Sequence, residues 1–340
     1  MGNLSLTKMA CAVFVFCAVI AISLHATTTF TSLLSFDGTN GEDPDAGLVQ
    51  GFNGNFYGTT YYGGAKDYGT VFEITPGGTL TTLHSFENSD GASPNAGLVQ
   101  ATNGNLYGTT VYGGSDKCPS GCGTVFEITA AGKLTTLFSF DSTDGAYPYA
   151  GLVQATNGNF YGATLQGGAT SDGTVFSLSV GLGPFVETLP AFGIEKATII
   201  ILGTNLTGAT KVTFGGTEAT FSVVSSSEIK AAVPSGAKTG TVEVTTPKGT
   251  LQSNLIFQVT PQLTSFTPTS GVVGTSVKIT GTELTYTTQV TFGGVKATDF
   301  TPVSDSEVTA DVPTGAKTGK IAITTPGGTS TSAASFTVTP

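Results

Sequence analysis

Apolar and polar residues alternate in short runs along the chain, and the same runs recur in order. AGLVQGFNGNFYGTT from Ala46 returns as AGLVQATNGNLYGTT from Ala96 and as AGLVQATNGNFYGAT from Ala150, each followed by GG and GTVF. The interval of about fifty residues is close to the length of a four-stranded propeller blade. The pattern therefore predicts an array of one repeated β unit.

Within the second repeat, alternation between turn residues predicts strands at 97–100, 106–110, 124–129 and 134–140. The run FTSLLSF at 30–36 aligns with the fourth strand, and the third repeat ends after its third strand. Three repeats are fewer than the four to eight blades of known rings. An open arc, a compact non-propeller β assembly and a homodimer that completes a ring therefore all stay open.

A second pattern follows a Gly/Pro hinge at 181–184 and occurs twice. IILGTNL, VTFGG and VPSGAKTG within 200–240 return as ITGTEL, VTFGG and VPTGAKTG within 279–319. Short strands broken by glycine and proline over some eighty residues are typical of a small β-sandwich. We expect an all-β chain, in which a propeller-like array of four-stranded repeats precedes two immunoglobulin-like β-sandwiches.

The N-terminal segment predicts export. Lys8 precedes an apolar run from Met9 to Leu24, the pattern of a cleaved signal peptide, and this run is short for a membrane span. We expect a signal peptide at 1–26, repeats at 27–180, and sandwiches at 184–259 and 261–340. The mature chain is expected to be secreted or held at a bacterial cell surface, without integral membrane association.

Charge and cysteine content narrow the functional classes. A net charge of −10 with 13 Lys plus Arg argues against nucleic acid as a partner. After removal of 1–26, the remaining cysteines are Cys118 and Cys122, in an insertion of the second repeat. Export permits a disulfide between them, which would stabilise the fold by on the order of 2 kcal/mol. A metal site is not expected, because no further ligands stand nearby.

Both halves of the chain resemble known families. Residues 184–340 are similar to tandem IPT/TIG domains, through Pro190 and Pro268, the I-x-G-T-x-L strand, the V-x-F-G-G hairpin and the VP-x-G turn. Residues 30–180 resemble the GloVer tandem repeat of exported, choice-of-anchor bacterial proteins, through GLVQ, NGNFYGTT, GG and GTVF. The resemblance implies immunoglobulin-like spacers or interaction modules and surface-exposed repeats. Members of the repeat family typically carry more repeats than three.

Candidate catalytic chemistry is sparse. His84 is the single histidine after residue 26, and it aligns with Leu34 and Phe138, which indicates a packed strand residue. Triads that need a histidine are thereby excluded, and we expect no enzymatic activity.

Acidic residues recur in the loop after each Ser-Phe pair. Oxygen ligands three positions apart suit Ca²⁺, which needs six to eight oxygens. The alternative is that these side chains bond their own backbone in turns. The candidates are Asp37, Asn40, Glu87, Asp90, Asp141 and Asp144. No other cofactor is expected.

One face of the array is favoured for binding. In a meander blade, the connection between the second and third strands and the connection to the next blade emerge together, and long loops on a rigid scaffold commonly carry binding residues. Tyrosines in these loops suit sugars or peptides, although the absence of Trp weakens the carbohydrate case. The predicted ligand-binding residues are Tyr61, Tyr62, Tyr112, Tyr147 and Tyr149.

The combined prediction is a modular protein of the cell exterior that binds an extracellular protein or glycan. The sandwiches would act as a stalk, and the array as the recognition, adhesion or assembly unit. One alternative is a carbohydrate-active or lactone-cleaving propeller enzyme that uses the acidic loops. A second alternative is a purely structural surface component.

Overall fold

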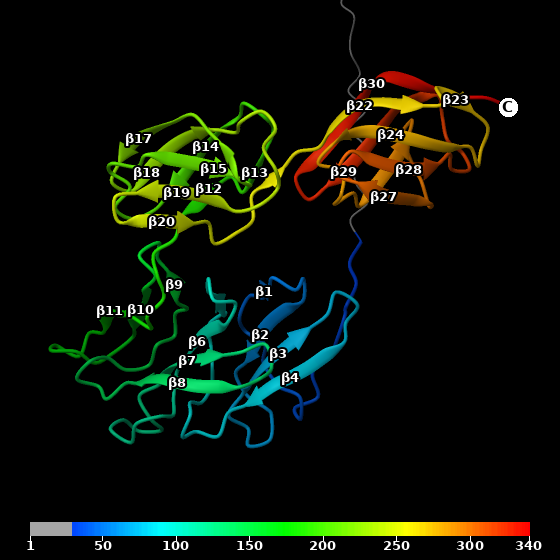
Figure 1. Cartoon of the computed structure of the whole chain (residues 1–340). Helices are drawn as coiled ribbons and strands as arrows, with labels where there is room; N and C mark the ends of the chain where they lie inside the picture. The colour runs from blue at the N-terminus through cyan, green and yellow to red at the C-terminus, as the bar shows by residue number, and fades with distance from the viewer. Residues whose placement is uncertain (1–28) are drawn as a thin grey trace, which may run out of the picture. The chain divides into compact units, whose positions relative to one another are not determined.

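The computed structural model describes residues 29–340, so the predicted signal peptide at 1–26 lies outside the described residues. The described part of the chain is all-β, as predicted (Figure 1). Within residues 29–340, no helix is long and apolar enough to cross a membrane.

Each repeat forms one antiparallel meander, in which neighbouring strands pair in sequence order. The first sheet contains β1 (Val49–Gln50), β2 (Phe56–Thr60), β3 (Thr70–Ile74) and β4 (Leu80–Ser85). The second contains β5 (Val99–Gln100), β6 (Leu106–Thr110), β7 (Thr124–Ile128) and β8 (Leu134–Ser139). The third has three strands, β9 (Val153–Gln154), β10 (Phe160–Thr164) and β11 (Thr174–Leu178). The predicted strands of the second repeat are confirmed to within two residues.

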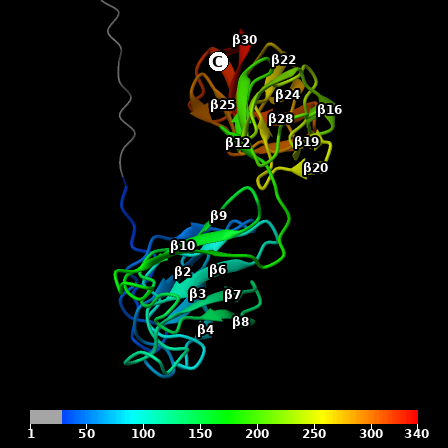
Figure 2. The same ribbon diagram turned by 90° about the vertical axis from the view of Figure 1, so that its left-hand side faces the viewer.

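The sheets of successive repeats follow one another along the array (Figure 1 and Figure 2). Apolar side chains pack between these sheets. The ring of Phe86, just after β4, lies 5.3 Å edge-on from Phe126 of β7. Phe140, just after β8, meets Phe176 of β11 in the same way at 5.2 Å. Edge-to-face pairs of this kind stabilise an aromatic contact beyond its buried area. The phenylalanine that ends each of the first two repeats therefore packs against the third strand of the following repeat.

The expected strand at 30–36 does not form. Residues 29–36 carry no strand pairing, although FTSLLSF matches the sequence of β4 and β8. A lone β-strand leaves its backbone groups without partners. The strand that lacks a fourth-strand partner within residues 29–340 is β11 of the third sheet, and residues 30–36 do not pair with it. The prediction of an N-terminal strand is therefore wrong for the single chain.

The first sandwich has two four-stranded sheets, ordered β12-β14-β18-β17 and β16-β15-β19-β20, and a small parallel pair, β13-β21. The strand bounds are β12 (Glu187–Leu189), β13 (Phe192–Gly193), β14 (Thr198–Leu202), β15 (Lys211–Phe214), β16 (Thr217–Glu218), β17 (Phe221–Ser225), β18 (Glu228–Ala232), β19 (Val242–Thr246), β20 (Gly249–Gln252) and β21 (Gln258–Val259).

The second sandwich repeats this topology, with sheets ordered β22-β24-β28-β27 and β23-β30-β29-β25-β26. Each sandwich encloses its own apolar core, centred on Phe214 and Phe257 in the first and on Phe292 and Phe336 in the second. The strand bounds are β22 (Gln262–Thr267), β23 (Ser270–Gly271), β24 (Ser276–Thr282), β25 (Gln289–Phe292), β26 (Val295–Lys296), β27 (Phe300–Ser304), β28 (Glu307–Asp311), β29 (Gly319–Thr325) and β30 (Gly328–Val338).

Candidate binding face of the repeat array

The NGNxYG segment builds a polar network with a glutamate of the third strand in the first and second repeats. In the second repeat, the buried Tyr107 hydroxyl donates to Glu127 Oε1 at 2.8 Å, and Asn105 Nδ2 donates to the same oxygen at 2.6 Å. Asn103 Nδ2 donates to the Tyr107 hydroxyl at 2.9 Å. Burial, and then the bond to Glu127, raise the pKa of Tyr107 to about 12. These groups hold the hairpin that carries the second strand toward the binding face.

The two loop types predicted to be neighbours do pair. Ala92, in the loop after β4, forms an antiparallel bridge with Tyr112, just after β6. The corresponding bridges in the other repeats are Glu42 with Tyr62 and Ala146 with Gln166. Gly91 allows the loop after β4 to come this close to the segment after β6, because a Cβ at position 91 would lie 2.6 Å from Thr110 Cγ2. Its φ of +137° is also a conformation that favours glycine.

The paired loops bring all five predicted tyrosines together. The Tyr61 and Tyr62 rings are edge-on at 4.6 Å, and the Tyr112 and Tyr147 rings are edge-on at 5.6 Å. The Tyr112 hydroxyl lies 3.5 Å from the Tyr149 hydroxyl. We call these five side chains the tyrosine cluster. Tyr62 is 43% exposed and Tyr149 is 38% exposed, so the cluster is open to solvent.

Two hydroxyls of the tyrosine cluster, those of Tyr61 and Tyr149, have raised pKa values. The hydrogen bond with Tyr112, together with burial, raises the pKa of Tyr149 to about 12. Burial raises the pKa of Tyr61, and Tyr112 adds to the rise. Neutral phenols can donate as well as accept hydrogen bonds. The cluster therefore presents aromatic faces beside hydroxyl groups that can both donate and accept hydrogen bonds.

The disulfide-bonded loop helps to position this cluster. Cys118 and Cys122 are joined with their Cα atoms 5.1 Å apart, and the Cys122 carbonyl accepts a hydrogen bond from the Tyr147 backbone N–H at 2.9 Å. Cys122 is fully buried, in a core cluster with Phe140 and Ala146. The insertion thus supports the segment from which Tyr147 projects, a link that spacing in the sequence did not reveal.

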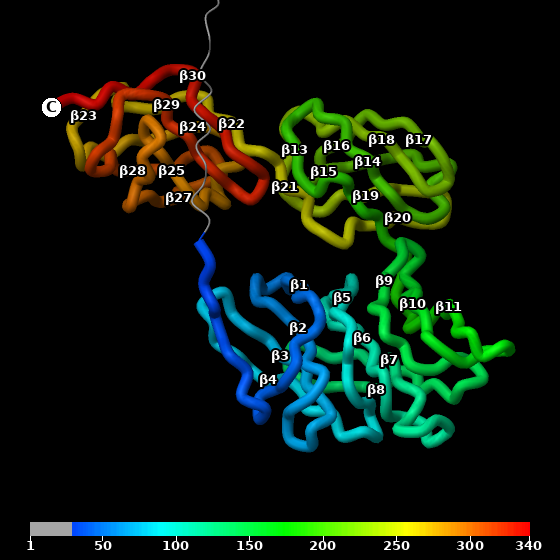
Figure 3. The backbone as a smooth tube through the Cα atoms, turned by 180° about the vertical axis from the view of Figure 1, so that it is seen from behind, coloured from blue at the N-terminus to red at the C-terminus, as the bar shows by residue number. Residues whose placement is uncertain are grey.

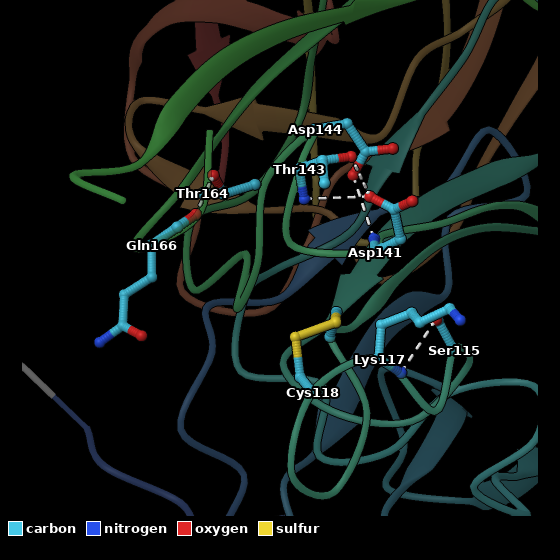
Figure 4. The surroundings of a disulfide bond; sticks show 9 residues. Ser115, Lys117, Cys118, Asp141, Thr143, Asp144, Thr164 and Gln166 are labelled. Carbon is cyan, nitrogen blue, oxygen red and sulfur yellow. Dashed lines mark hydrogen bonds between the residues drawn. A yellow bond between two sulfur atoms is a disulfide. The ribbon is translucent and has the colours of Figure 1, made fainter. Parts of the chain in front are cut away.

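The acidic loop residues bond to their own turns. Asp141 Oδ1 accepts from the Thr143 N–H at 3.0 Å, and Asp144 Oδ1 accepts from the Asp141 N–H at 3.1 Å (Figure 4). Asn40 Oδ1 likewise accepts from the Asp37 N–H, and Asp90 Oδ1 from the Glu87 N–H.

These hydrogen bonds match the turn alternative. The bond to the Thr143 side chain holds the pKa of Asp141 below its usual range, and the Thr39 side chain acts in the same way on Asp37. Within residues 29–340, no group of three or more His, Cys, Asp or Glu side chains is placed to hold a metal ion. Calcium binding stays a prediction without further support from this geometry.

His84 lies partly buried beside its own loop. Its Nε2 is 2.7 Å from Asp90 Oδ2, and its ring packs edge-on against Phe86 at 5.2 Å. This is the packed strand position that the sequence predicted, with a carboxylate partner that it did not. Asp90 thereby links β4 to the turn that it closes.

Two residues near the cluster escaped the sequence analysis. Asn95 Nδ2 donates to the Tyr149 carbonyl at 3.3 Å, and the Ser93 carbonyl accepts from the Val111 N–H. Ser93 and Asn95 occupy in their loop the places that Tyr147 and Tyr149 occupy one repeat later, on either side of a proline. An alignment of the loops that follow the Ser-Phe pairs would have placed Ser93 and Asn95 beside the predicted tyrosines.

Similarity to solved structures is weak. The surface glycan-binding protein SGBP-B of Bacteroides uniformis is 22% identical, over 45% of this chain and 48% of that chain, with a TM-score of 0.23. PbSGBP-B of Prevotella bryantii is 16% identical, over 47% and 40%, with a TM-score of 0.29. This chain thus spans less than half the length of either protein. No curated protein matches the sequence.

Family models match both halves of the chain. The IPT/TIG domain model matches residues 261–338, the second sandwich. The first sandwich has the same strand order, but its assignment to that family stays a prediction. The model of the Gloeobacter/Verrucomicrobia repeat matches residues 16–225, more than half of the 340 residues. The chain therefore belongs to the Gloeobacter/Verrucomicrobia repeat family, with an IPT/TIG domain at its C-terminal end.

Proposed function

We propose that this chain is an exported, non-enzymatic binding protein whose array recognises a neutral glycan through the tyrosine cluster. The observation that carries the proposal is the convergence of five tyrosines from three loops, centred on Tyr112 with its contacts to Tyr147 and Tyr149. Aromatic faces pack against the C–H faces of sugar rings, and the phenol groups bond sugar hydroxyls. The sandwiches serve as spacers that present the array.

The charge of the protein favours an uncharged ligand. The net charge of −10 repels anionic polysaccharides, and Glu42, Asp43 and Asp45 lie in the loop that pairs with Tyr62. Neutral phenols add no charge at this face, because the pKa values of Tyr61 and Tyr149 are raised. Export agrees with the apolar segment at 9–24 and with the disulfide, which requires an oxidising compartment.

A binding role is favoured over catalysis by the state of the acidic residues. Glycoside hydrolysis needs two carboxyl groups with different roles on either side of a bond. Here the loop acids bond to their own turns in each repeat, as Asp37 and Asp141 do. The recurrence of these bonds at equivalent positions supports a structural role.

The test is binding to a panel of neutral and anionic soluble polysaccharides by calorimetry. Tyr112→Ala is expected to weaken binding of a neutral glycan about tenfold or more, because it removes the centre of the cluster. The matched control is Tyr286→Ala, since Tyr286 is 54% exposed on the second sandwich.

Equal affinity of the wild type, Tyr112→Ala and Tyr286→Ala would place the glycan site elsewhere. Absence of binding to every neutral glycan would reject the proposed ligand class. Release of reducing sugars by the wild type, lost on substitution of one particular loop acid, would support the enzymatic alternative instead.

A further inference from the structure

The third repeat exposes a strand edge that the other two repeats cover. β3 and β7 each pair with a fourth strand, β4 and β8, whereas β11 pairs with β10 alone within residues 29–340. Val71 of β3 and Val125 of β7 are 0% and 1% exposed, but the equivalent Val175 of β11 is 84% exposed. An open edge next to exposed apolar side chains is a template for another strand.

An apolar hollow lies beside this edge. Its volume is about 90 Å³, and its lining includes Phe138 and Phe140 from the second repeat and Phe176 and Leu178 from β11. Val125 completes the apolar part of the wall. The hollow and the open strand form one surface that a single extended segment would cover.

The chain itself contains a segment with the sequence of the missing strand. FTSLLSF at 30–36 corresponds residue by residue to LTTLHSF at 80–86 and LTTLFSF at 134–140. Phe30 and Leu33 are 93% and 48% exposed, so apolar side chains of this segment remain uncovered in the single chain. Neither 30–36 nor β11 carries an ionisable residue, and Asp144 is the one ionisable residue among those that line the hollow.

The position of Phe36 argues that the acceptor is a second copy. Phe36 packs edge-on against Phe72 at 5.2 Å, as Phe86 packs on Phe126 and Phe140 on Phe176. Phe36 thus stands where a preceding repeat would end. The first and third sheets lie at opposite ends of the array (Figure 3). Phe36, the last residue of the donor segment, therefore belongs to one end of the array, and the acceptor edge of β11 belongs to the other.

We propose that segment 30–36 of one copy adds to β11 of a second copy as its fourth strand. The register of β3 with β4 sets the expected pairs: Ser35 opposite Thr174, Leu34 opposite Val175, and Phe30 opposite Leu178. Leu33 falls at the bulge, as Leu83 does between β3 and β4. The contact is head-to-tail, and two copies that each donate and accept form a closed ring of six repeats, within the range of known propellers.

The experiment measures the mass of the mature chain, residues 27–340, by light scattering over a range of concentrations. The wild type is expected to double its mass or exceed that, whereas Val175→Lys and Leu34→Asp are each expected to stay monomeric. Lysine at 175 places a charge against the apolar strand, and its exposed position keeps the fold intact. Val303→Lys, at a 55% exposed valine of the second sandwich, is the matched control and should assemble as the wild type does.

Mixing the two monomeric variants gives the decisive result. The Val175→Lys chain retains its donor segment and the Leu34→Asp chain retains its acceptor edge, so the mixture is expected to form one-to-one dimers. Recovery of this dimer also shows that both variants are folded. A monomeric wild type, an assembly insensitive to both substitutions, or a mixture without dimers would each overturn the proposal.

Discussion

At the scale of single residues, the repeated motif is explained by hydrogen bonds rather than by ligand binding. Tyr57 in the first repeat donates to Glu73 Oε1 at 2.7 Å, as Tyr107 donates to Glu127. The third repeat differs, because Ser177 stands opposite Tyr161 where a glutamate would complete the network. Asn157 Nδ2 still donates to the Tyr161 hydroxyl at 3.0 Å.

This difference gives a matched pair of variants. Tyr107→Phe removes a donor from Glu127 and takes from Asn103 Nδ2 the nearer of its two acceptors, so the free energy of unfolding should fall by about 1–3 kcal/mol. Tyr161→Phe removes only the contact with Asn157 and should cost less. Denaturant unfolding of both variants measures the difference. A greater loss for Tyr161→Phe would contradict the structural role of the glutamate.

The raised pKa of Tyr107 predicts a loss of stability at high pH. The pKa of Tyr107 is raised from 10.0 to about 12 in the folded state, mainly by burial. The unfolded chain therefore ionises first, and the stabilisation, complete below pH 10, is lost as the pH rises toward 12. Unfolding free energies measured at pH 9 and pH 11.5 should show a steeper decline in the wild type than in Tyr107→Phe. Parallel declines would mean that other tyrosines carry the effect.

At the scale of elements, the insertion between β6 and β7 supports the loops that carry the tyrosine cluster. Its disulfide closes a short loop, and Cys122 both fills a core position and accepts the Tyr147 N–H. The two loops that meet at Tyr112 and Tyr147 are thus fixed by covalent and hydrogen-bonded contacts. A braced loop loses less conformational entropy when a ligand binds.

Reduction of this disulfide should lower the stability of the array by about 2 kcal/mol, because the open loop gains conformational freedom in the unfolded chain. Thermal unfolding with and without dithiothreitol measures the change. The double variant Cys118→Ala with Cys122→Ala should show the lower midpoint under both conditions. An unchanged wild-type midpoint after confirmed reduction would show that the apolar packing of residue 122 suffices alone.

At the scale of the whole molecule, the apolar cores are separate. The core of the second sandwich draws all its members from 263–338, and the core of the first sandwich draws all of its members from 186–259. The clusters of the array contain neither set. A unit with its own core can fold independently of its neighbours.

Calorimetry of the full chain is therefore expected to show more than one unfolding transition. A fragment of residues 261–340 should unfold cooperatively and reproduce one of them, since its sheets and core are complete. Dithiothreitol should shift the transition of the array and leave that of the fragment unchanged. A single transition in the full chain, together with an unfolded fragment, would show that the sandwich depends on its neighbours.

Most of the fold could be predicted from local sequence patterns. Alternation and turn residues predicted the strands of the second repeat and the duplicated sandwich, because strand periodicity and turn chemistry act over a few residues. The neighbouring loops were also predicted, since a meander returns alternate connections to the same face. The pairing of Cys118 with Cys122 was predicted from the expected export and from the spacing, and the structure places it beside Tyr147.

What the sequence determined by itself was the repeat, its strand order and the residues that face its loops. Only the tertiary structure decided that FTSLLSF forms no strand in one chain, that β11 keeps an open edge within residues 29–340, and that Tyr112 contacts both Tyr147 and Tyr149. The reason is physical: strand propensity is local, whereas a strand also needs a hydrogen-bonded neighbour, and side-chain convergence depends on how successive sheets pack.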